Sequence, residues 1–236
     1  MNIKADILIL GGGEAGFFAA VHAARLNPQL RVVVAEKSSK LLSKVLVSGG
    51  GRCNVTHECY DKGVLVGNYP RGGPGLRQIF GRWGPEETEA WFECMGVQLT
   101  TEADGRMFPQ TNRSETVARC LLSEAERLGV AIQLNTHYTS VQVVDQGFVL
   151  QSTQGSVHCK HLLVATGGHP KAEAYAWLAA LGHRIVPPVP SLFTFNLPAH
   201  PITELMGVSV TDARVRLPQF KKATQGPVLI THWGLS

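Results

Sequence analysis

The sequence predicts an α/β fold, with a parallel sheet and a β-meander in its first part and a smaller β-rich part after them. Within residues 4–36, a glycine-rich turn joins a short apolar run to a helix-like segment and a second apolar run. Residues 130–165 hold short alternating runs that are separated by turns. Residues 191–236 contain strand-like runs and few helix signals, which indicates the start of a second, β-rich domain.

Composition limits the classes of protein to be considered. The 236 residues are 44% hydrophobic and 17% charged, which excludes an intrinsically disordered chain. The net charge of +4 is mild and we find no basic run, so we expect no nucleic-acid partner. Asp6 and Glu14 interrupt the first apolar stretch, and no window resembles a membrane span, so we expect neither a signal peptide nor membrane insertion. Five scattered cysteines indicate reduced thiols and predict a cytoplasmic location.

The first forty residues carry the strongest pattern. Lys4–Leu10 is a nearly continuous apolar run, which is typical of a strand that is buried on both faces. It leads into a G-x-G-x-x-G turn at residues 11–16, and Phe17–Leu26 then has apolar residues at helical spacing. A second strand, Arg31–Glu36, ends in an acid twenty positions after the last glycine of the turn.

Each part of this pattern has a role in dinucleotide binding. Gly11 allows the tight turn, Gly13 lets the backbone approach a pyrophosphate, and Gly16 lets the helix pack close to the strand. The start of the helix offers unpaired N–H groups to the phosphates. Glu36 would accept hydrogen bonds from a ribose and disfavours a 2′-phosphate, which indicates FAD or NAD rather than NADP. The alternative is a Rossmann-like turn that binds nothing.

The elements that follow favour flavin over nicotinamide. A helix over Ser114–Leu128 precedes a third strand, Val130–Leu134. Alternating runs at Tyr138–Val144 and Phe148–Thr153 then lead to a longer run, Val157–Ala165. This meander of antiparallel strands stands where a plain NAD domain would have a helical crossover.

The meander and the A-T-G segment that follows it resemble the glutathione-reductase type of flavoprotein, in which this segment approaches FAD. More narrowly, the chain resembles the BaiN/RdsA (YhiN-like) family of NAD(P)/FAD-dependent oxidoreductases along essentially its whole length. The blocks that carry this resemblance are Lys44–Thr56 (KVLVSGGGRCNVT), Gly105–Pro109 (GRMFP), Ala165–Gly168 (ATGG), Pro190–Leu192 (PSL) and Thr231–Ser236 (THWGLS).

The chain departs from the family in several places. Ser43 stands where the family usually has glycine, and His57 where it often has asparagine. After the A-T-G-G block, the chain runs into a helix that ends near Leu181, where many members have a second glycine-rich stretch. The family's chains continue beyond Ser236 through the rest of an inserted domain and a further FAD-contacting segment, so we expect this chain to be truncated.

Residues 44–56 form a predicted glycine-rich loop after three lysines. Gly49, Gly50 and Gly51 allow the backbone to lie flat on a planar ligand, while Lys44 and Arg52 supply positive charge to a pyrophosphate or an anionic flavin. The residues alone leave a flexible, solvated surface loop equally open, and the resemblance favours the flavin loop. The complete set of predicted cofactor-binding residues is Gly11, Gly13, Glu14, Ala15, Gly16, Glu36, Lys37, Lys44, Gly49, Gly50, Gly51, Arg52, Cys53, Asn54, Val141, Ala165, Thr166, Gly167 and Gly168.

Other side chains give weaker predictions of a metal, redox or substrate-binding role. Cys53, His57 and Cys59 are too few for a zinc site, so we expect no metal and assign the cysteines to packing, with a redox role for Cys53 as the alternative. Arg106 lies near the cofactor or on a solvated hairpin tip, and His232 is a weak candidate for a substrate contact. We expect the aromatic residues to pack the helices beside residues 63–84; they are Phe80, Trp83, Trp91 and Phe92. No catalytic residue is assigned.

These observations predict a FAD-binding domain over residues 1–188 and part of a β-rich substrate domain over 189–236, joined at the stiff Pro187–Pro190 segment. The resemblance implies an FAD-dependent oxidoreductase that is linked to NAD(P)H and acts on an unidentified small organic substrate. A non-catalytic dinucleotide-binding module is the alternative for a truncated chain. A flavoprotein that acts on RNA is a third hypothesis, disfavoured by the lack of a basic run. The oligomeric state does not follow from the sequence.

Overall fold

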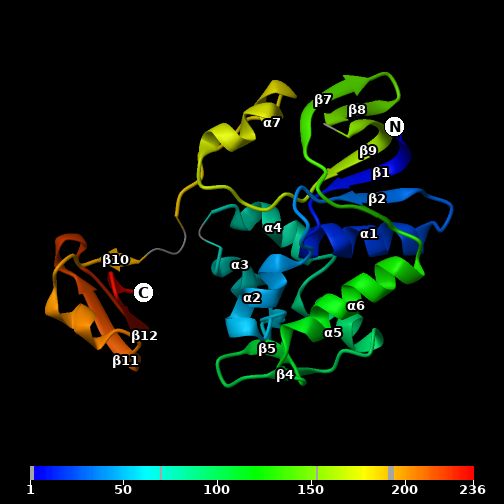
Figure 1. The fold of residues 1–236 in the computed structure, drawn as a ribbon. Coiled ribbons are helices and arrows are strands. Elements are labelled where there is room, and N and C mark those ends of the chain that lie inside the picture. Colours follow the sequence, from blue (N-terminus) through cyan, green and yellow to red (C-terminus); the bar gives the residue numbers. More distant parts are fainter. Residues whose placement is uncertain (1–2, 70, 153, 191–193) are drawn as a thin grey trace. The chain divides into compact units, whose positions relative to one another are not determined.

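The computed structural model describes residues 3–69, 71–152, 154–190 and 194–236. The chain forms two compact units, Met1–Gly168 and His169–Ser236 (Figure 1). The first unit ends directly after the A-T-G-G block, ahead of the proline-rich segment at which the sequence places its domain limit. The predicted domain ranges, 1–188 and 189–236, stay a prediction.

A six-stranded sheet organises the first unit, with the strand order β6-β2-β1-β9-β8-β7. The first four strands in this order run parallel, whereas β8 and β7 continue the sheet as antiparallel neighbours. β9 is therefore both the last strand of the meander and a central strand of the parallel sheet. This arrangement confirms the predicted Rossmann-like fold with a meander. The strands are β1 (Ile3–Leu10), β2 (Val32–Ala35), β6 (Ala131–Gln133), β7 (Tyr138–Val144), β8 (Gly147–Ser152) and β9 (Gly155–Val164).

The register of the central strands creates one functional edge. Leu10 at the end of β1 pairs with Ala35 at the end of β2 and with Val164 at the end of β9. The glycine turn, Glu36 and the A-T-G-G block each follow directly after one of these three strand ends. In α/β sheets the carboxyl ends of parallel strands are where ligands bind, so the register brings the predicted cofactor segments to that edge.

Two helices, α1 (Glu14–Leu26) and α6 (Ser114–Arg127), lie together on one face of the sheet (Figure 1). Their apolar positions recur at helical spacing, and Phe17, Val21 and Leu121 are fully buried between the helices and the strands. Glu124 of α6 accepts hydrogen bonds from Arg25 of α1 at 2.7 Å and from Arg127 at 2.6 and 2.8 Å. The two helices are thus joined by a polar contact as well as by the core.

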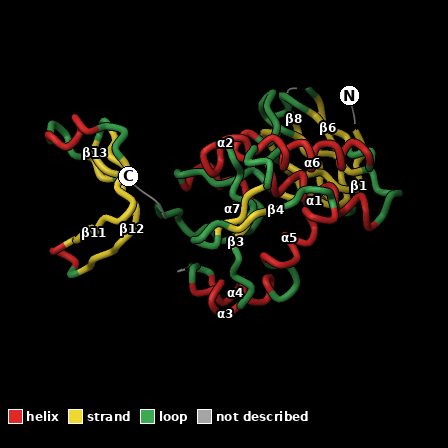
Figure 2. Tube along the Cα trace, turned by 90° about the horizontal axis from the view of Figure 1, so that it is seen from below, coloured by secondary structure: helices red, strands yellow, loops and turns green. Residues whose placement is uncertain are grey.

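The segment between β2 and α6 folds into four short helices and a three-stranded sheet with the order β3-β5-β4 (Figure 2). Its elements are α2 (Ser43–Gly51), β3 (Thr56–His57), α3 (Lys62–Gly67), α4 (Gly73–Phe80), α5 (Pro85–Cys94), β4 (Leu99–Thr101) and β5 (Arg106–Pro109).

The predicted loop at residues 44–56 is partly helical, so that prediction is wrong for its first half. α2 begins at Ser43 and buries Val45 in the core, which stabilises a helical turn despite the glycines that follow. The helix is interrupted at Ser48, where the backbone is extended, and Gly49 and Gly50 adopt left-handed conformations. The sequence shows these glycines but does not show that Val45 is buried.

Aromatic side chains fill the space between α1 and α5. Trp83 and Trp91 contact the ring of Phe18 edge-on, with ring centroids 5.2 and 5.0 Å apart, and Trp91 lies 4.8 Å from Phe92. The predicted packing role is confirmed for these residues. Phe80 instead pairs with Tyr69 at 5.5 Å.

The second unit contains a short helical segment and a four-stranded sheet, as its β-rich pattern predicts. Residues 172–180 form a 3₁₀ turn followed by α7 (Ala176–Ala180). The sheet has the order β10-β13-β12-β11, with β10 (Phe195–Asn196), β11 (Ser209–Leu217), β12 (Lys222–Thr231) and β13 (Gly234–Leu235). Part of the predicted strand near Phe195 lies outside the described residues. Across the described parts of both units, no helix is long and apolar enough to cross a membrane.

Candidate cofactor site

The glycine turn packs tightly against the A-T-G-G block. The Ala165 N–H donates to the Leu10 carbonyl at 2.8 Å, which holds the block beside the end of β1. A Cβ atom at Gly11 would overlap the Ala165 carbonyl oxygen, and one at Gly16 would overlap that of Gly11. Only glycine fits these two positions, as the sequence pattern predicts.

At Gly13, in contrast to Gly11 and Gly16, an added Cβ atom would meet no atom within 4 Å. Gly13 is the N-cap residue of α1, and no side chain caps the first N–H groups of this helix. Glu14 and Ala15 lie exposed in the first turn, and partial desolvation of the Glu14 carboxyl raises its pKa. The open space above a helix N-terminus fits the pyrophosphate of a dinucleotide.

Glu36 reaches across to the glycine turn. Its two carboxylate oxygens accept hydrogen bonds from the backbone N–H groups of Gly12 and Ser38, each at 2.9 Å. Burial alone would raise the pKa of this carboxyl, but the hydrogen bonds and the charge of Lys37 outweigh it and lower the pKa. The side chain is therefore ionised at neutral pH and keeps free lone pairs for ribose hydroxyls.

A segment that the sequence did not single out lies beside Glu36. The Thr136 N–H donates to the Glu36 carbonyl at 2.9 Å, and the Asn135 N–H donates to the Ser38 carbonyl at 3.1 Å. The sequence feature that could have identified this segment is the Asn-Thr pair that follows the third parallel strand. The structure does not bring Val141 here: it pairs with Leu150 in the meander, in register with the beginning of β1. The glycine turn follows the other end of β1, so the length of that strand separates Val141 from the turn.

The loop after β9 and the start of α2 come together. Thr166, Gly167 and Gly168 are exposed, and a Cβ atom at Gly167 would lie 3.5 Å from the Lys44 ammonium nitrogen. The Leu42 N–H donates to the Gly12 carbonyl at 2.9 Å, which ties α2 to the glycine turn. Lys44 therefore stands next to the A-T-G-G block.

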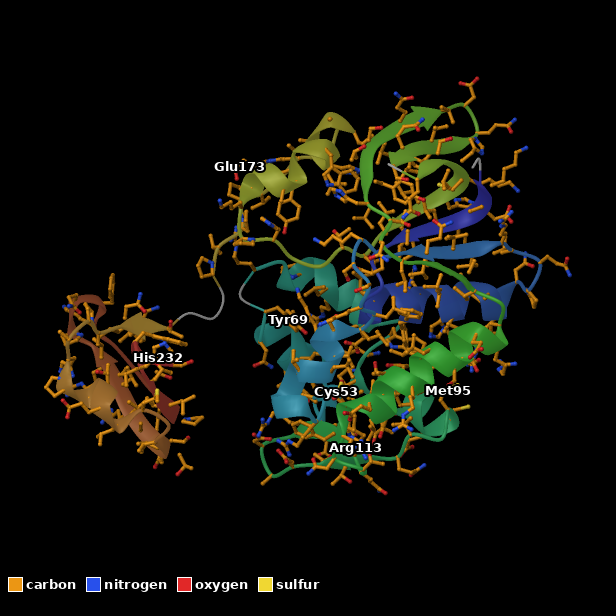
Figure 3. The ribbon with its side chains drawn as sticks, in the orientation of Figure 1. Cys53, Tyr69, Met95, Arg113, Glu173 and His232 are labelled. Carbon is orange, nitrogen blue, oxygen red and sulfur yellow. The ribbon has the colours of Figure 1, made fainter. Side chains whose placement is uncertain are left out.

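The last turn of α2 contains two exposed glycines, and a buried cysteine follows it. Gly49 is confined, because a Cβ atom there would lie 2.9 Å from both the Asn54 nitrogen and a ring carbon of Phe108. A Cβ atom at Gly50 would meet no atom within 4 Å. Cys53, which Figure 3 labels, is buried, and burial raises the pKa of its thiol. The thiol is protonated at neutral pH, which is unlike a redox-active thiolate.

Arg52 does not offer a free charge, contrary to the predicted role. Its guanidinium pairs with Glu102 at 2.6 Å and lies over the Phe108 ring at 4.0 Å. Arg106 pairs with the same Glu102 at 3.1 Å and with Asp104 at 2.7 Å. Both arginines thus pair with carboxylates of the β4–β5 hairpin, and Arg52 meets its partner only in the folded chain.

A cleft of about 340 Å³ opens beside Asn54. One wall carries the Tyr69–Phe80 ring pair, and the Trp83 indole N–H donates to the Thr88 hydroxyl at 3.0 Å. Sequence analysis assigned only packing to Phe80 and Trp83 and did not find Tyr69 (Figure 3). The lining residues are Asn54, Val55, Thr56, His57, Leu65, Tyr69, Phe80, Trp83, Gly84, Pro85 and Thr88.

The remaining candidates make contacts of their own. The His57 Nε2 atom lies 2.9 Å from the Asp104 carbonyl oxygen, and His232 stacks edge-on against Trp233 at 4.2 Å in the second unit. All five cysteines are free. Within the part of the chain that the structure describes, no cluster of three or more His, Cys, Asp or Glu residues is arranged to hold a metal ion.

Known proteins share this fold and sequence pattern. The chain is 28% identical to the 3-dehydro-bile acid delta(4,6)-reductase of Clostridium scindens over 97% of this chain and 57% of that protein. It is also 28% identical to the ribosomal RNA dihydrouridine synthase of Haemophilus influenzae, over 100% of this chain and 60% of that protein. The chain thus spans about three fifths of the length of these relatives.

A solved structure shows the same fold at lower sequence identity. The 3-ketosteroid-delta4-(5alpha)-dehydrogenase of Rhodococcus jostii matches with a TM-score of 0.57 and 16% identity, over 74% of this chain and 48% of that one. Residues 5–232 match the family described as the HI0933-like protein Rossmann domain. Because this match covers nearly the whole sequence, the chain belongs to the HI0933-like family.

Proposed function

We propose that the protein is a flavin-dependent oxidoreductase that holds FAD without a covalent bond at the edge formed by β1, β2 and β9. The observation that carries this proposal is the open start of α1 at Gly13, flanked by the ionised Glu36 and by Lys44. The α1 N–H groups would hold the pyrophosphate, and the Glu36 carboxylate would hold the ribose. The exposed backbone of Gly49 and Gly50 and the half-buried Gly51 would support the flavin ring.

The reaction that we propose is hydrogenation of a carbon–carbon double bond that is conjugated to a carbonyl group. A delta(4,6)-reductase and a dihydrouridine synthase, the activities in the names of two relatives, both add two hydrogens to such a bond in a ring. Bound FAD, once reduced, supplies hydride. The substrate's β-carbon accepts that hydride and its α-carbon accepts a proton. We further propose NAD(P)H as the source of electrons and, from the five free cysteines, a cytoplasmic location.

The cleft beside Asn54 is our proposed substrate site. Its aromatic wall, formed by Tyr69, Phe80 and Trp83, fits a flat ring, while the Asn54 amide and the Thr56 hydroxyl offer hydrogen bonds to a carbonyl oxygen. These side chains would orient the ring, and the cleft would exclude water from one of its faces.

The test is a cofactor-binding experiment on the 236-residue chain. We expect the purified protein, supplied with FAD and freed of excess, to show flavin absorption bands and to release FAD on denaturation. The variant Gly13→Ala should fold normally, since its methyl group meets no protein atom, but should bind FAD at least about tenfold more weakly, because the methyl group occupies the pyrophosphate space.

Gly226→Ala is the matched control, because Gly226 also has no neighbour within 4 Å of an added Cβ atom and lies in the second unit. This variant should bind FAD as the wild type does. A wild-type chain that takes up no FAD, or a Gly13→Ala variant with unchanged affinity, would contradict the proposed site.

A further inference from the structure

The β11–β12 hairpin of the second unit concentrates positive charge at its tip. Arg214 and Arg216 alternate with half-buried residues along β11 and project from one exposed face. Two residues apart in a strand, they lie about 7 Å from each other. Lys222 pairs with Leu217 across the hairpin, so its side chain lies on the opposite face from the two arginines, and Lys221 lies in the turn between the strands. Four cations therefore occupy the last rungs of one hairpin.

No acidic residue offsets this charge locally. The stretch from Arg214 to Lys222 contains no Asp or Glu, and none of the ion pairs found in the described residues involves its four cations. The carboxylate of Asp212, the nearest acid in the sequence, accepts a hydrogen bond from Gln225 at 2.7 Å. The second unit holds six Lys and Arg against three Asp and Glu, whereas the first is almost balanced at sixteen against fifteen. Most of the protein's net charge thus belongs to the second unit.

The same turn carries an exposed aromatic side chain. Phe220 is 70% exposed in the turn, directly before Lys221 and Lys222. An exposed aromatic ring flanked by cations is the combination by which proteins bind single-stranded nucleic acid, since bases stack on the ring while phosphates pair with the cations. Arginine adds planar, bidentate contacts to phosphate.

The sequence has no basic run, which by itself predicts no nucleic-acid partner. The four cations are split by the Leu217–Phe220 segment, and only the antiparallel pairing of β11 with β12 gathers them at one tip. A membrane surface fits this tip less well, because Phe220 is the one large apolar side chain of the turn, and stable anchoring to a membrane takes more apolar area than one ring.

We infer that the β11–β12 tip is a binding surface for single-stranded RNA, formed by Arg214 and Arg216 on one face of the hairpin together with Phe220 and Lys221 of the turn. This inference is independent of the proposed flavin site, because every residue of the surface lies in the second unit. The surface contacts backbone phosphates and one stacked base, so its preference for sequence is weak and its affinity falls steeply with salt.

The test measures fluorescence anisotropy of a short, labelled, single-stranded RNA titrated with the 236-residue chain at several salt concentrations. We expect R214Q/R216Q to weaken binding about tenfold or more at low salt and to reduce the salt slope by about 1.4, from about 0.7 per lost phosphate contact. K171Q/R184Q is the matched control. It removes the same charge from exposed positions of the same unit outside the hairpin, and it should bind like the wild type.

Phe220 is tested separately from the charge. F220A should weaken binding about fivefold or more without changing the salt slope, and F220W should retain binding because it keeps a stacking surface. Circular dichroism spectra that match the wild type establish that each variant is folded. The inference is overturned by a wild-type chain that binds no RNA, by equal losses in the hairpin and control variants, or by binding to phosphatidylserine vesicles in place of RNA. Because RNA binding is measured without FAD, failure of the flavin proposal leaves this result interpretable.

Discussion

At the scale of single residues, Tyr69 contributes to the aromatic wall of the cleft, and it lies outside every motif of the sequence. The residue is 42% exposed, and its ring pairs with Phe80 at 5.5 Å. Replacing it by alanine removes one aromatic face from the cleft but leaves the glycine turn and Glu36 untouched. We expect Tyr69→Ala to weaken binding of a flat ring enone about tenfold, because aromatic stacking adds about 1 kcal/mol to the lost contact area.

Isothermal titration with 4-androstene-3,17-dione as the probe would measure this change. Tyr60→Ala is the control, since Tyr60 is 43% exposed and lies outside the lining of the cleft, with its hydroxyl bonded to Glu89. Equal effects of the two variants on ring binding, or a loss of FAD affinity in Tyr69→Ala, would speak against the assignment of the cleft.

At the scale of elements, Glu124 joins α6 to α1 through a hydrogen bond with Arg25. Hydrogen bonds from Arg127 and then from Arg25 outweigh burial and hold the pKa of this carboxyl at about 2. Its unfolded pKa is higher, so the ionised side chain stabilises the fold above about pH 4.5, and this contribution is lost as the pH falls from about 4.5 towards 2. Glu124→Gln should lower the free energy of unfolding by about 2 kcal/mol at neutral pH, because it weakens hydrogen bonds between charged groups.

Urea unfolding at pH 7 and pH 3 would measure this prediction. Glu126→Gln makes the same change of charge at an exposed position of the same helix and should change stability by less than about 0.5 kcal/mol. The difference between the two variants should shrink at pH 3. A Glu124 variant that is as stable as the Glu126 variant at pH 7 would exclude this role.

At the scale of the whole molecule, the two units differ in how many buried hydrophobic residues they contain. Among the described residues, Ile230 is the only hydrophobic residue of the second unit that is buried, whereas the first unit contains the rest of the core. The second unit is therefore held chiefly by strand hydrogen bonds, which open more readily than a packed core. We expect amides of β11 and β12 to exchange with solvent at least about tenfold faster than those of β1 and β9.

Hydrogen–deuterium exchange followed by mass spectrometry would resolve the two units within one sample. The paired strands β1 and β9 serve as an internal reference, because both are long and hydrogen-bonded along their lengths. Protection of β11 and β12 equal to that of the reference would mean that the second unit is stabilised by more than its own strand pairing.

Local patterns in the sequence were sufficient to place the glycine turn and its neighbours in the candidate site. The turn from Gly11 to Gly16, the acid at Glu36 and the A-T-G-G block could be placed in advance, because each follows directly after a strand whose apolar run is evident. Parallel pairing then aligns the ends of these strands, so the segments meet without any contact that the sequence would have to specify separately.

Contacts between distant segments decided the rest, and they leave no local signal. Arg52 is neutralised by Glu102, fifty residues later, and the helical start of α2 depends on burial of Val45. The ring pair of the cleft forms only when α3 and α4 fold together, and the cations of the β11–β12 tip meet only across a hairpin. Short-range periodicity and turn chemistry determined the strands, the turn and Glu36. The partners of charged and aromatic side chains follow from long-range packing, which only the tertiary structure supplies.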